Sequence, residues 1–192
     1  RKLMPRTAVQ NAIIRDKRKT KIMMKTLKLF ATRGFDEITI DGISNESNCS
    51  HGLIYHYFEK KDDIFNDLLV LQSEEFKESV FPKDAALAAG GLDGLKIVCE
   101  HYENLKNFSK NHLYFAKVNL NRDYSTYTAT KDLNGESPLA TIATLCDQAG
   151  LAEDVPMSFV DYLNGVISRL ISAEGKMTEL PSGQLFAFIS KK

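Results

Sequence analysis

A helical repeat of apolar residues near the N-terminus is the feature that most constrains the fold. Between residues 16 and 33 the apolar side chains fall at positions i, i+4, i+7 and i+8, and they are Met23, Leu27, Phe30 and Ala31. A helix places those positions on one face, where they can pack against a neighbouring helix. Gly34 follows, and glycine commonly ends a helix because it adopts a positive φ without strain. We therefore predict a helix from Asp16 to about Arg33.

The same period returns along the rest of the chain, whereas no strand-like alternation persists. Further helices are predicted over residues 40–47, 51–57, 61–76, 92–109, 111–122, 139–149, 156–174 and 183–190. Residues 1–15 are predicted to form an N-terminal tail, although their apolar residues could extend the first helix. The segments 85–94 and 123–138 are predicted to be loosely structured. The fold class is therefore all-α, with roughly nine helices.

Composition excludes several classes of protein. The 192 residues contain no apolar run near the roughly 20 residues that a membrane span needs, and no signal peptide is visible. The three cysteines, Cys49, Cys99 and Cys146, are widely spaced and odd in number, which favours reduced thiols over a disulfide framework. We expect a cytoplasmic protein that does not contact a membrane.

Opposite charges divide the chain. Residues 1–61 carry 13 Lys and Arg against 6 Asp and Glu, a net charge of +7, and residues 62–192 carry 12 against 19, a net charge of −7. A basic segment suits contact with a polyanion, although it can also be a solvated surface. The division favours a polyanionic partner for the first part of the chain.

Two short helices joined by a tight turn are predicted after Gly34. Thr39 can cap the first helix, Ser50 can cap the second, and Asn48 between them tolerates a left-handed conformation. A helix followed by two short ones is the plan of a helix-turn-helix, in which the second short helix enters the DNA major groove. The sequence therefore predicts a DNA-binding unit.

The second short helix carries side chains that suit a DNA surface. Its first residues can contact base edges, and the free backbone N–H groups there favour phosphate. Gly52 allows close approach, whereas Ile54 and Phe58 face the small core. Lysines can neutralise phosphate charge. The predicted DNA-binding residues are Lys17, Thr39, Ser50, His51, Gly52, Leu53, Tyr55, His56, Lys60 and Lys61.

The run from Phe30 to Phe65, FATRGFDEITIDGISNESNCSHGLIYHYFEKKDDIF, closely resembles the DNA-binding region of the TetR family of bacterial transcriptional repressors. Asn48 replaces the usual turn glycine, and His51 stands where lysine is frequent. Leu53 stands where Thr, Ser or Asn is common, and it could contact a thymine methyl instead. The positions that match the family pattern are Gly34, Phe35, Thr39, Ser50, Gly52, Tyr55, Tyr57, Phe58, Lys60, Lys61 and Asp63.

This resemblance implies a homodimeric transcriptional regulator, usually a repressor, with no catalytic activity and no cofactor. Its partner would be a roughly palindromic double-stranded DNA operator, and an unknown small-molecule effector would release it. The implied domains are an N-terminal tail (1–15), a helix-turn-helix domain (16–61) and a helical effector-binding and dimerisation domain (62–192). Two other classes stay open, namely an all-α enzyme or small-molecule carrier and a non-specific nucleic-acid binder.

The helix predicted at 156–174 is apolar around most of its circumference, which indicates burial on more than one side. A dimer interface is the predicted use, and an ordinary core helix is the alternative. The candidate interface residues are Leu163, Ile167, Leu170, Phe186 and Ile189. The resemblance also implies an effector pocket, which aromatic side chains would suit. The candidate ligand-binding residues are Tyr102, Phe115, Tyr127, Phe159 and Tyr162.

A metal site built from Cys49, His51 and His56 is a further alternative. The spacing matches no common zinc pattern, and histidines five residues apart do not share a helix face. We therefore predict no metal site and no catalytic residue. Cys99 and Cys146 leave a redox role open, because thiol reactivity depends on a pKa that the sequence does not give.

Overall fold

The computed structural model describes residues 7–121 and 137–172. These residues form nine α-helices and two short 3-10 helices, with no strand among them, and the predicted all-α fold class is confirmed. No helix in this part of the chain is long and apolar enough to cross a membrane. Most of the predicted loop 123–138 and the predicted helix 183–190 lie outside the described residues, as do three candidate site residues, Tyr127, Phe186 and Ile189.

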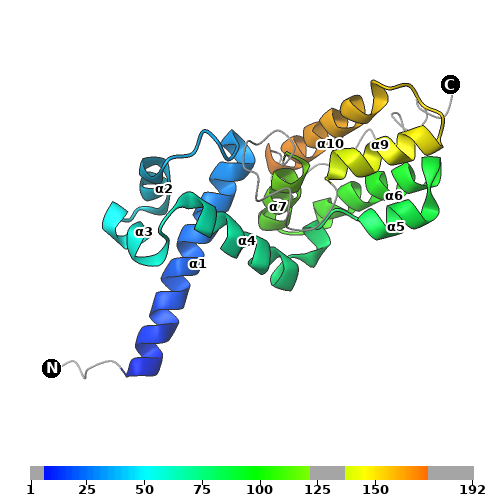
Figure 1. Cartoon of the computed structure of the whole chain (residues 1–192). Coiled ribbons are helices and arrows are strands. Elements are labelled where there is room, and N and C mark those ends of the chain that lie inside the picture. Colours follow the sequence, from blue (N-terminus) through cyan, green and yellow to red (C-terminus); the bar gives the residue numbers. More distant parts are fainter. Residues whose placement is uncertain (1–6, 122–136, 173–192) are drawn as a thin grey trace.

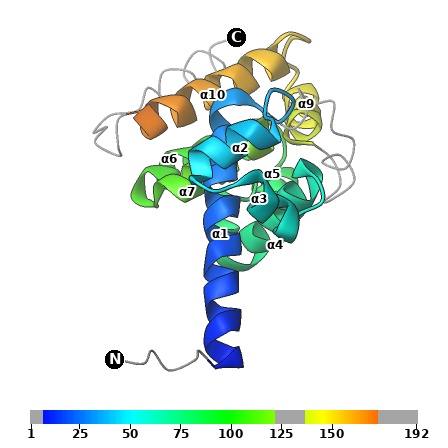
Figure 2. The same cartoon turned by 90° about the vertical axis from the view of Figure 1, so that its left-hand side faces the viewer.

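Helix α1 (Ala8–Arg33) begins earlier than the sequence predicted. A tail was expected over residues 1–15, but the helix includes every residue from Ala8 onward. A reciprocal cap explains this start, because the Gln10 N–H donates to Thr7 Oγ1 at 3.2 Å and the Thr7 N–H donates to Gln10 Oε1 at 3.0 Å. The N-terminal turns of α1 project away from the rest of the molecule (Figures 1 and 2).

The first four helices form an N-terminal lobe, which we call the head. Gly34 ends α1 with a φ of 84°, as expected for a helix-terminating glycine. The helices α2 (Ile40–Ser47), α3 (His51–Tyr57) and α4 (Lys61–Glu75) follow close to their predicted positions. One apolar core holds them together, and its buried members include Ile22, Leu27, Phe30, Ile38, Ile43, Ile54, Phe58, Ile64, Phe65 and Leu68.

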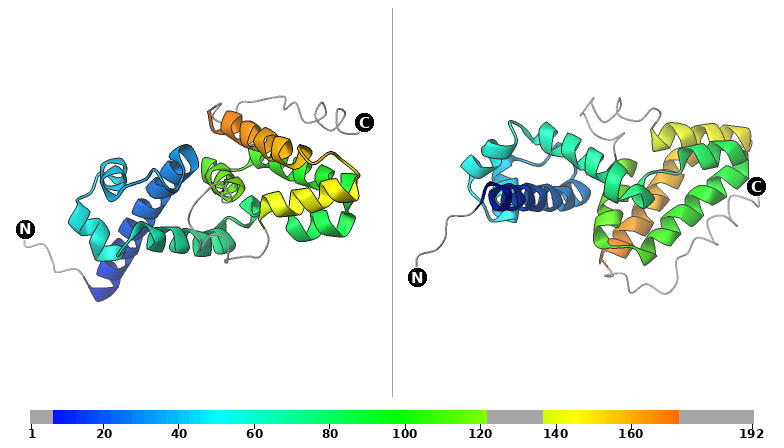
Figure 3. Two further views of the ribbon diagram at one scale, coloured as in Figure 1. Left: turned by 45° about the horizontal axis from the view of Figure 1, so that its top comes forward. Right: turned by 90° about the horizontal axis from the view of Figure 1, so that it is seen from below.

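The remaining described helices form a second lobe, which we call the body. The view in Figure 3 separates the head, with α3 at its outer end, from the body. The elements of the body are η1 (Lys77–Ser79), α5 (Lys83–Ala89), α6 (Gly91–Asn104), η2 (Leu105–Asn107), α7 (Lys110–Leu120), α9 (Pro138–Gln148) and α10 (Val155–Ser172).

Helix α5 lies where the sequence predicted a loose segment. Seven residues rarely form a stable helix alone, so α5 depends on packing against its neighbours. Gly94 on α6 permits that packing, because a Cβ atom there would lie closer than 3.0 Å to the carbonyl oxygen of Ala86 and to a methyl group of Leu145. Helices α5 and α6 therefore pack closely because residue 94 has no side chain. The hydrophobic periodicity of the sequence does not reveal this contact.

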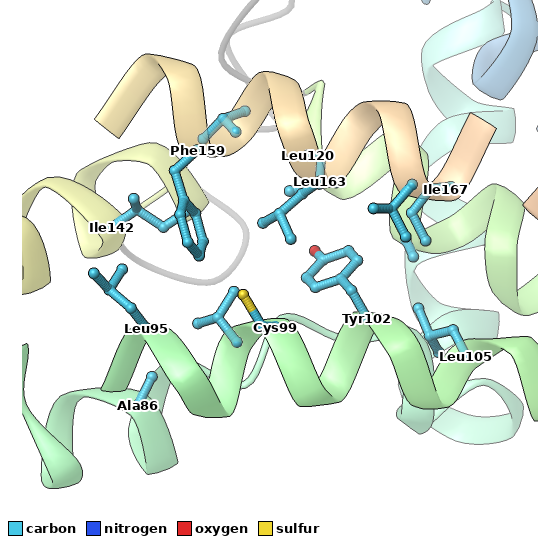
Figure 4. Close-up of a cluster of buried hydrophobic side chains, with 14 of the residues drawn as sticks. Ala86, Leu95, Cys99, Tyr102, Leu105, Leu120, Ile142, Phe159, Leu163 and Ile167 are labelled. Carbon is cyan, nitrogen blue, oxygen red and sulfur yellow. The ribbon is translucent and has the colours of Figure 1, made fainter. Parts of the chain in front are cut away.

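Apolar side chains of α6, α7, α9 and α10 meet in the core of the body. Figure 4 shows Phe159 and Leu163 on α10 pointing toward α6, while Cys99 and Tyr102 point back toward α10. Tyr102 is 0% exposed, and Phe159 is 1% exposed. The body is thus closed around these residues by helices of a single chain.

The predicted dimer contacts on α10 need a correction. Leu163, Ile167 and Leu170 are each at most 1% exposed and belong to the core of the body. The alternative of an ordinary core helix therefore holds for these three residues, because α6, α7 and α9 already cover them. The exposed side of α10 carries polar groups, such as Asp161 and Arg169.

Head and body meet at a packed junction. Tyr114 and Phe115 of α7 belong to the same apolar cluster as the head residues, and α7 lies against α1. The Phe115 ring lies 4.9 Å from the ring of Phe76, which follows the end of α4. A movement of α7 would therefore reach the head through close contacts.

Candidate nucleic-acid interface

The turn between α2 and α3 is fixed by local hydrogen bonds. Asn48 adopts the left-handed conformation that the sequence predicted, with φ 51° and ψ 54°. The Ser44 hydroxyl donates to the carbonyl oxygen of Cys49 at 2.5 Å. Thr39 caps α2 by accepting from the Gly42 N–H at 3.2 Å, and Ser50 caps α3 by accepting from the Leu53 N–H at 3.3 Å. These bonds hold the two short helices in one arrangement.

Helix α3 has an inner side and an outer side. Ile54 is 0% exposed and Phe58 is 2% exposed, and both lie in the head core. The predicted DNA-binding residues His51, Gly52, Tyr55 and His56 are exposed, and Tyr55 is 55% exposed. Lys60, just beyond the helix, is also exposed, whereas Leu53 is half-buried. The structure therefore places five of the ten predicted residues on one short surface helix.

His51 has a partner within the head. Its Nε2 atom lies 3.1 Å from the Oδ1 atom of Asp41, which stands in the first turn of α2. The contact joins the starts of α2 and α3, the two helix ends whose free N–H groups favour anions. A His51 contact to phosphate would therefore compete with Asp41.

The lysines of α1 flank the two short helices. The Lys28 ammonium donates to the Glu46 carboxylate at 2.8 Å, and this bond holds the pKa of the Glu46 carboxyl below its usual range. Burial raises the pKa of the Cys49 thiol, and the nearby Lys21 ammonium opposes the rise. Lys17 is exposed and lies one helical turn before Lys21, on the same side of α1. Lys17 therefore stays a predicted DNA contact on the side of α1 that also carries Lys21.

Two basic residues beside α3 were missed by the sequence analysis. Lys21 is one, and Lys19 is the other. The Lys19 ammonium lies 5.4 Å from the centre of the Phe58 ring and 2.6 Å from the Asp67 carboxylate. Lys19 precedes Ile22 by three residues, so it continues the buried face of α1. The three-residue spacing between Lys19 and Ile22 could therefore have predicted that Lys19 lies on the side of α1 that faces α3.

Lys61 was predicted to contact DNA phosphate, but its ammonium lies in a different place. It donates to the carbonyl oxygens of Phe35 at 2.8 Å, Ile38 at 3.2 Å and Asp36 at 3.5 Å. It also lies 4.3 Å from the centre of the Phe35 ring. The side chain is half-buried against the segment between α1 and α2. Lys61 is thus turned inward, unlike its neighbour Lys60.

Comparison with known proteins identifies this lobe. Residues 22–68 match the family model described as bacterial regulatory proteins of the tetR family. This range covers α2, α3, the C-terminal part of α1 and the first half of α4. Residues 22–68 therefore carry the TetR-family pattern. The match includes the capped turn and both sides of α3, so the residues that build the helix-turn-helix are those that carry the family pattern.

One curated relative matches this chain over a limited stretch. The HTH-type transcriptional repressor KstR2 of Rhodococcus jostii (strain RHA1) is 29% identical over 76 residues. The match covers 40% of this chain and 35% of the relative. The similarity thus extends over about a third of the relative's own length.

The candidate ligand residues inside the described part of the chain are divided between two places. Tyr102 and Phe159 share the core of the body, and the half-buried Tyr162 packs against it. Phe115 instead belongs to the cluster at the junction with the head, so it does not share their surroundings. Phe115 stays a candidate ligand residue, but it lies apart from the other three.

Two thiols of the body are poor candidates for redox chemistry. Burial raises the pKa of Cys99 to about 12 and that of Cys146 to about 11. Both cysteines are therefore protonated near neutral pH, and a reactive cysteine needs an exposed thiolate. In the described part of the chain, no three His, Cys, Asp or Glu side chains are grouped as metal ligands.

Proposed function

We propose that this chain is a homodimeric transcriptional repressor that binds a DNA operator through α3. The observation that carries the proposal is the two-sided character of α3, which is anchored by Ile54 and Phe58 and offers its other side to solvent. The excess of basic residues in the first 61 residues supplies the charge that phosphate contacts need. The relative KstR2 is named a repressor, which supports repression as the mode of regulation.

Two copies of the chain are proposed to share one operator. Helix α3 has seven residues, so it spans about 10 Å and reads only a few base pairs. Helix-turn-helix proteins gain a longer site by binding as dimers to half-sites about 34–36 Å apart. We therefore propose a roughly palindromic operator, with Phe186 and Ile189 as the remaining candidate dimer contacts.

Operator binding can be tested by selecting bound fragments from bacterial genomic DNA. The selected duplex and a random duplex are then compared at several salt concentrations, and the number of chains per duplex is measured by mass photometry. We expect a preference of about a thousandfold or more and two chains per operator. Equal affinity for both duplexes at every salt concentration would exclude a sequence-specific regulator.

Replacing Tyr55 with phenylalanine should weaken operator binding about tenfold or more. The exposed hydroxyl can donate to a phosphate oxygen, and a hydrogen bond to a charged group contributes about 1.5–3 kcal/mol net of hydration. Fluorescence anisotropy measures the affinity, and circular dichroism checks the fold. Tyr114→Phe, at a residue 8% exposed at the junction, is the matched control and should bind normally. Unchanged affinity of the Tyr55 variant would contradict the proposed orientation of α3.

The body is proposed to bind a small-molecule effector near Tyr102. The Tyr102 side chain is fully buried, and its hydroxyl has no hydrogen-bond partner among the described residues. Such a group costs about 1–3 kcal/mol, which a ligand can recover by bonding to it. Buried polar atoms of Thr141, Tyr162 and Asn164 also lack partners within the same part of the chain. An effector would release the DNA only if it bound more tightly to a conformer whose heads do not fit the operator.

Replacing Tyr102 with phenylalanine should raise the free energy of unfolding by about 1 kcal/mol in the absence of effector. The substitution removes an unpartnered hydroxyl and leaves the packed ring in place. Urea denaturation measures the change. Tyr114→Phe serves again as the control, because its hydroxyl is not among the buried groups without a partner. A loss of about 1 kcal/mol or more in the Tyr102 variant would show that the hydroxyl is already bonded.

A further inference from the structure

We propose that Lys61 is a positioning residue that ties the start of α4 to the segment between α1 and α2, and thereby sets the orientation of α3. The inference rests on the proposed DNA-binding function, since orientation matters only if α3 reads DNA. It assigns to Lys61 a role other than the phosphate contact that the sequence suggested.

The contacts of the Lys61 ammonium account for its three donor hydrogens. Its distances to the carbonyl oxygens of Phe35, Ile38 and Asp36 are 2.8, 3.2 and 3.5 Å. A lysine has three N–H donors and no acceptor, so three carbonyls around it satisfy the group. The Phe35 ring at 4.3 Å adds a favourable contact for the cation. Little donor capacity remains for a phosphate.

The segment that Lys61 holds leads directly into the DNA-reading helices. Residues 34–39 connect the end of α1 to Thr39, the N-cap of α2. Helices α2 and α3 follow as one unit, because the turn between them is closed by the Ser44 hydroxyl. A change in the path of residues 34–39 would therefore move α3 as well.

The other end of the connection lies on the helix that runs toward the body. Lys61 is the first residue of α4. Two residues later, the Asp63 carboxylate accepts hydrogen bonds from the backbone N–H groups of Glu59 and Lys60, each at 3.0 Å. The Phe65 ring on α4 lies 5.4 Å from the Phe35 ring. Helix α4 therefore contacts the segment between α1 and α2 through two side chains, Lys61 and Phe65. Helix α4 then reaches Phe76, which contacts the body.

These contacts make α4 and the reading helices move together. A displacement of α4 that starts in the body would shift residues 34–39 through Lys61 and Phe65, and α2 and α3 would follow. Lys61 thus increases the preference for the operator over random DNA. A phosphate contact would instead increase the affinity for all DNA sequences alike.

The test compares full-length wild-type protein with Lys61→Met and Lys60→Met. Each protein is titrated with the selected operator duplex and with a random duplex at several salt concentrations. The three readouts are the operator affinity, the ratio of operator to random affinity, and the slope of log K against log salt. Lys60 is the matched control, because it is the adjacent lysine and its side chain is exposed.

We expect Lys61→Met to lower the ratio of operator to random affinity at least tenfold and to leave the salt slope unchanged. Lys60→Met should weaken both DNAs to a similar degree and reduce the salt slope by about 0.9, as the loss of one phosphate contact does. A fraction of unfolded protein would lower both affinities equally, so instability alone cannot produce the expected change in the ratio.

Two outcomes overturn the inference. One is a Lys61→Met protein that keeps the wild-type ratio, and the other is one whose salt slope falls by about 0.9 with an unchanged ratio, which assigns Lys61 to phosphate. If Lys61→Met does not fold, Lys61→Arg is measured in the same way, and a wild-type ratio there also overturns it, because arginine keeps the charge without the three-carbonyl geometry. A wild-type protein with no operator preference would instead refute the proposed function.

Discussion

Replacing Ile54 with alanine is expected to lower the free energy of unfolding by about 2–4 kcal/mol and to abolish specific operator binding. Ile54 is 0% exposed and is the buried residue of α3 itself, so truncation removes apolar contacts and leaves a cavity in the head core. Helix α3 has seven residues and cannot persist without this anchor. Urea denaturation and operator titration measure the two effects.

The adjacent residue provides the contrast. Tyr55→Phe changes an exposed side chain and should alter stability by no more than about 0.5 kcal/mol, although it weakens DNA binding. Comparing the two variants thus separates the anchoring of α3 in the head core from its contact with DNA. An Ile54→Ala protein with wild-type stability would mean that Ile54 does not hold α3 in the head core.

Replacing Gly94 with alanine is expected to lower the free energy of unfolding by about 1–3 kcal/mol. The new Cβ would lie closer than 3.0 Å to the Ala86 carbonyl oxygen, which cannot move without displacing α5, and to a Leu145 methyl group on α9. Overpacking of this kind forces helices apart. Chemical denaturation measures the loss, and the operator affinity of the remaining folded protein should be nearly normal, because Gly94 is in the body.

Gly165→Ala is the matched control for this prediction. Gly165 also lies within a helix, but among the described residues no atom outside its own helix backbone lies within 4 Å of an added Cβ. Alanine is favoured over glycine in a helix interior, so this variant should gain about 0.5–1 kcal/mol. The same substitution therefore has opposite expected signs at the two positions. A stabilised Gly94 variant would contradict the close contact of α5 with α6.

The junction between the lobes gives the effector hypothesis a physical route. Phe115 was predicted as a ligand residue, yet it packs with the head cluster and against Phe76. Its position suits a residue that transmits a displacement of α7, because α7 also contacts α10 and α1. At the other end of α4, the Lys61 ammonium contacts the segment between α1 and α2. Body and reading helix are thus connected through packed side chains at each step.

The sequence predicted the head well because its signals are local. Gly34 ends α1, Thr39 and Ser50 cap the short helices, and Asn48 makes the turn, and each of these depends on residues a few positions away. The inner and outer sides of α3 also follow from the helical period. These features need no knowledge of distant residues, and the family match at residues 22–68 coincides with them.

The body was harder to predict because its packing joins distant parts of the chain. Helix α5 depends on Gly94 and on Leu145 of α9, more than fifty residues away in sequence. The apolar circumference of α10 was compatible with either a dimer contact or a core position. Leu163 is buried by neighbouring helices, so it occupies a core position.

The helical class, the caps and turn of the head, and the outward side of α3 were all predictable from local patterns, because periodicity and capping are properties of short segments. Local patterns did not reveal that Lys61 faces inward to three carbonyls or that Phe115 belongs to the junction. They also did not reveal that the Tyr102 hydroxyl is buried with no partner among the described residues. The direction and the partners of a side chain depend on which distant segments pack around it, and a short stretch of sequence does not contain that information.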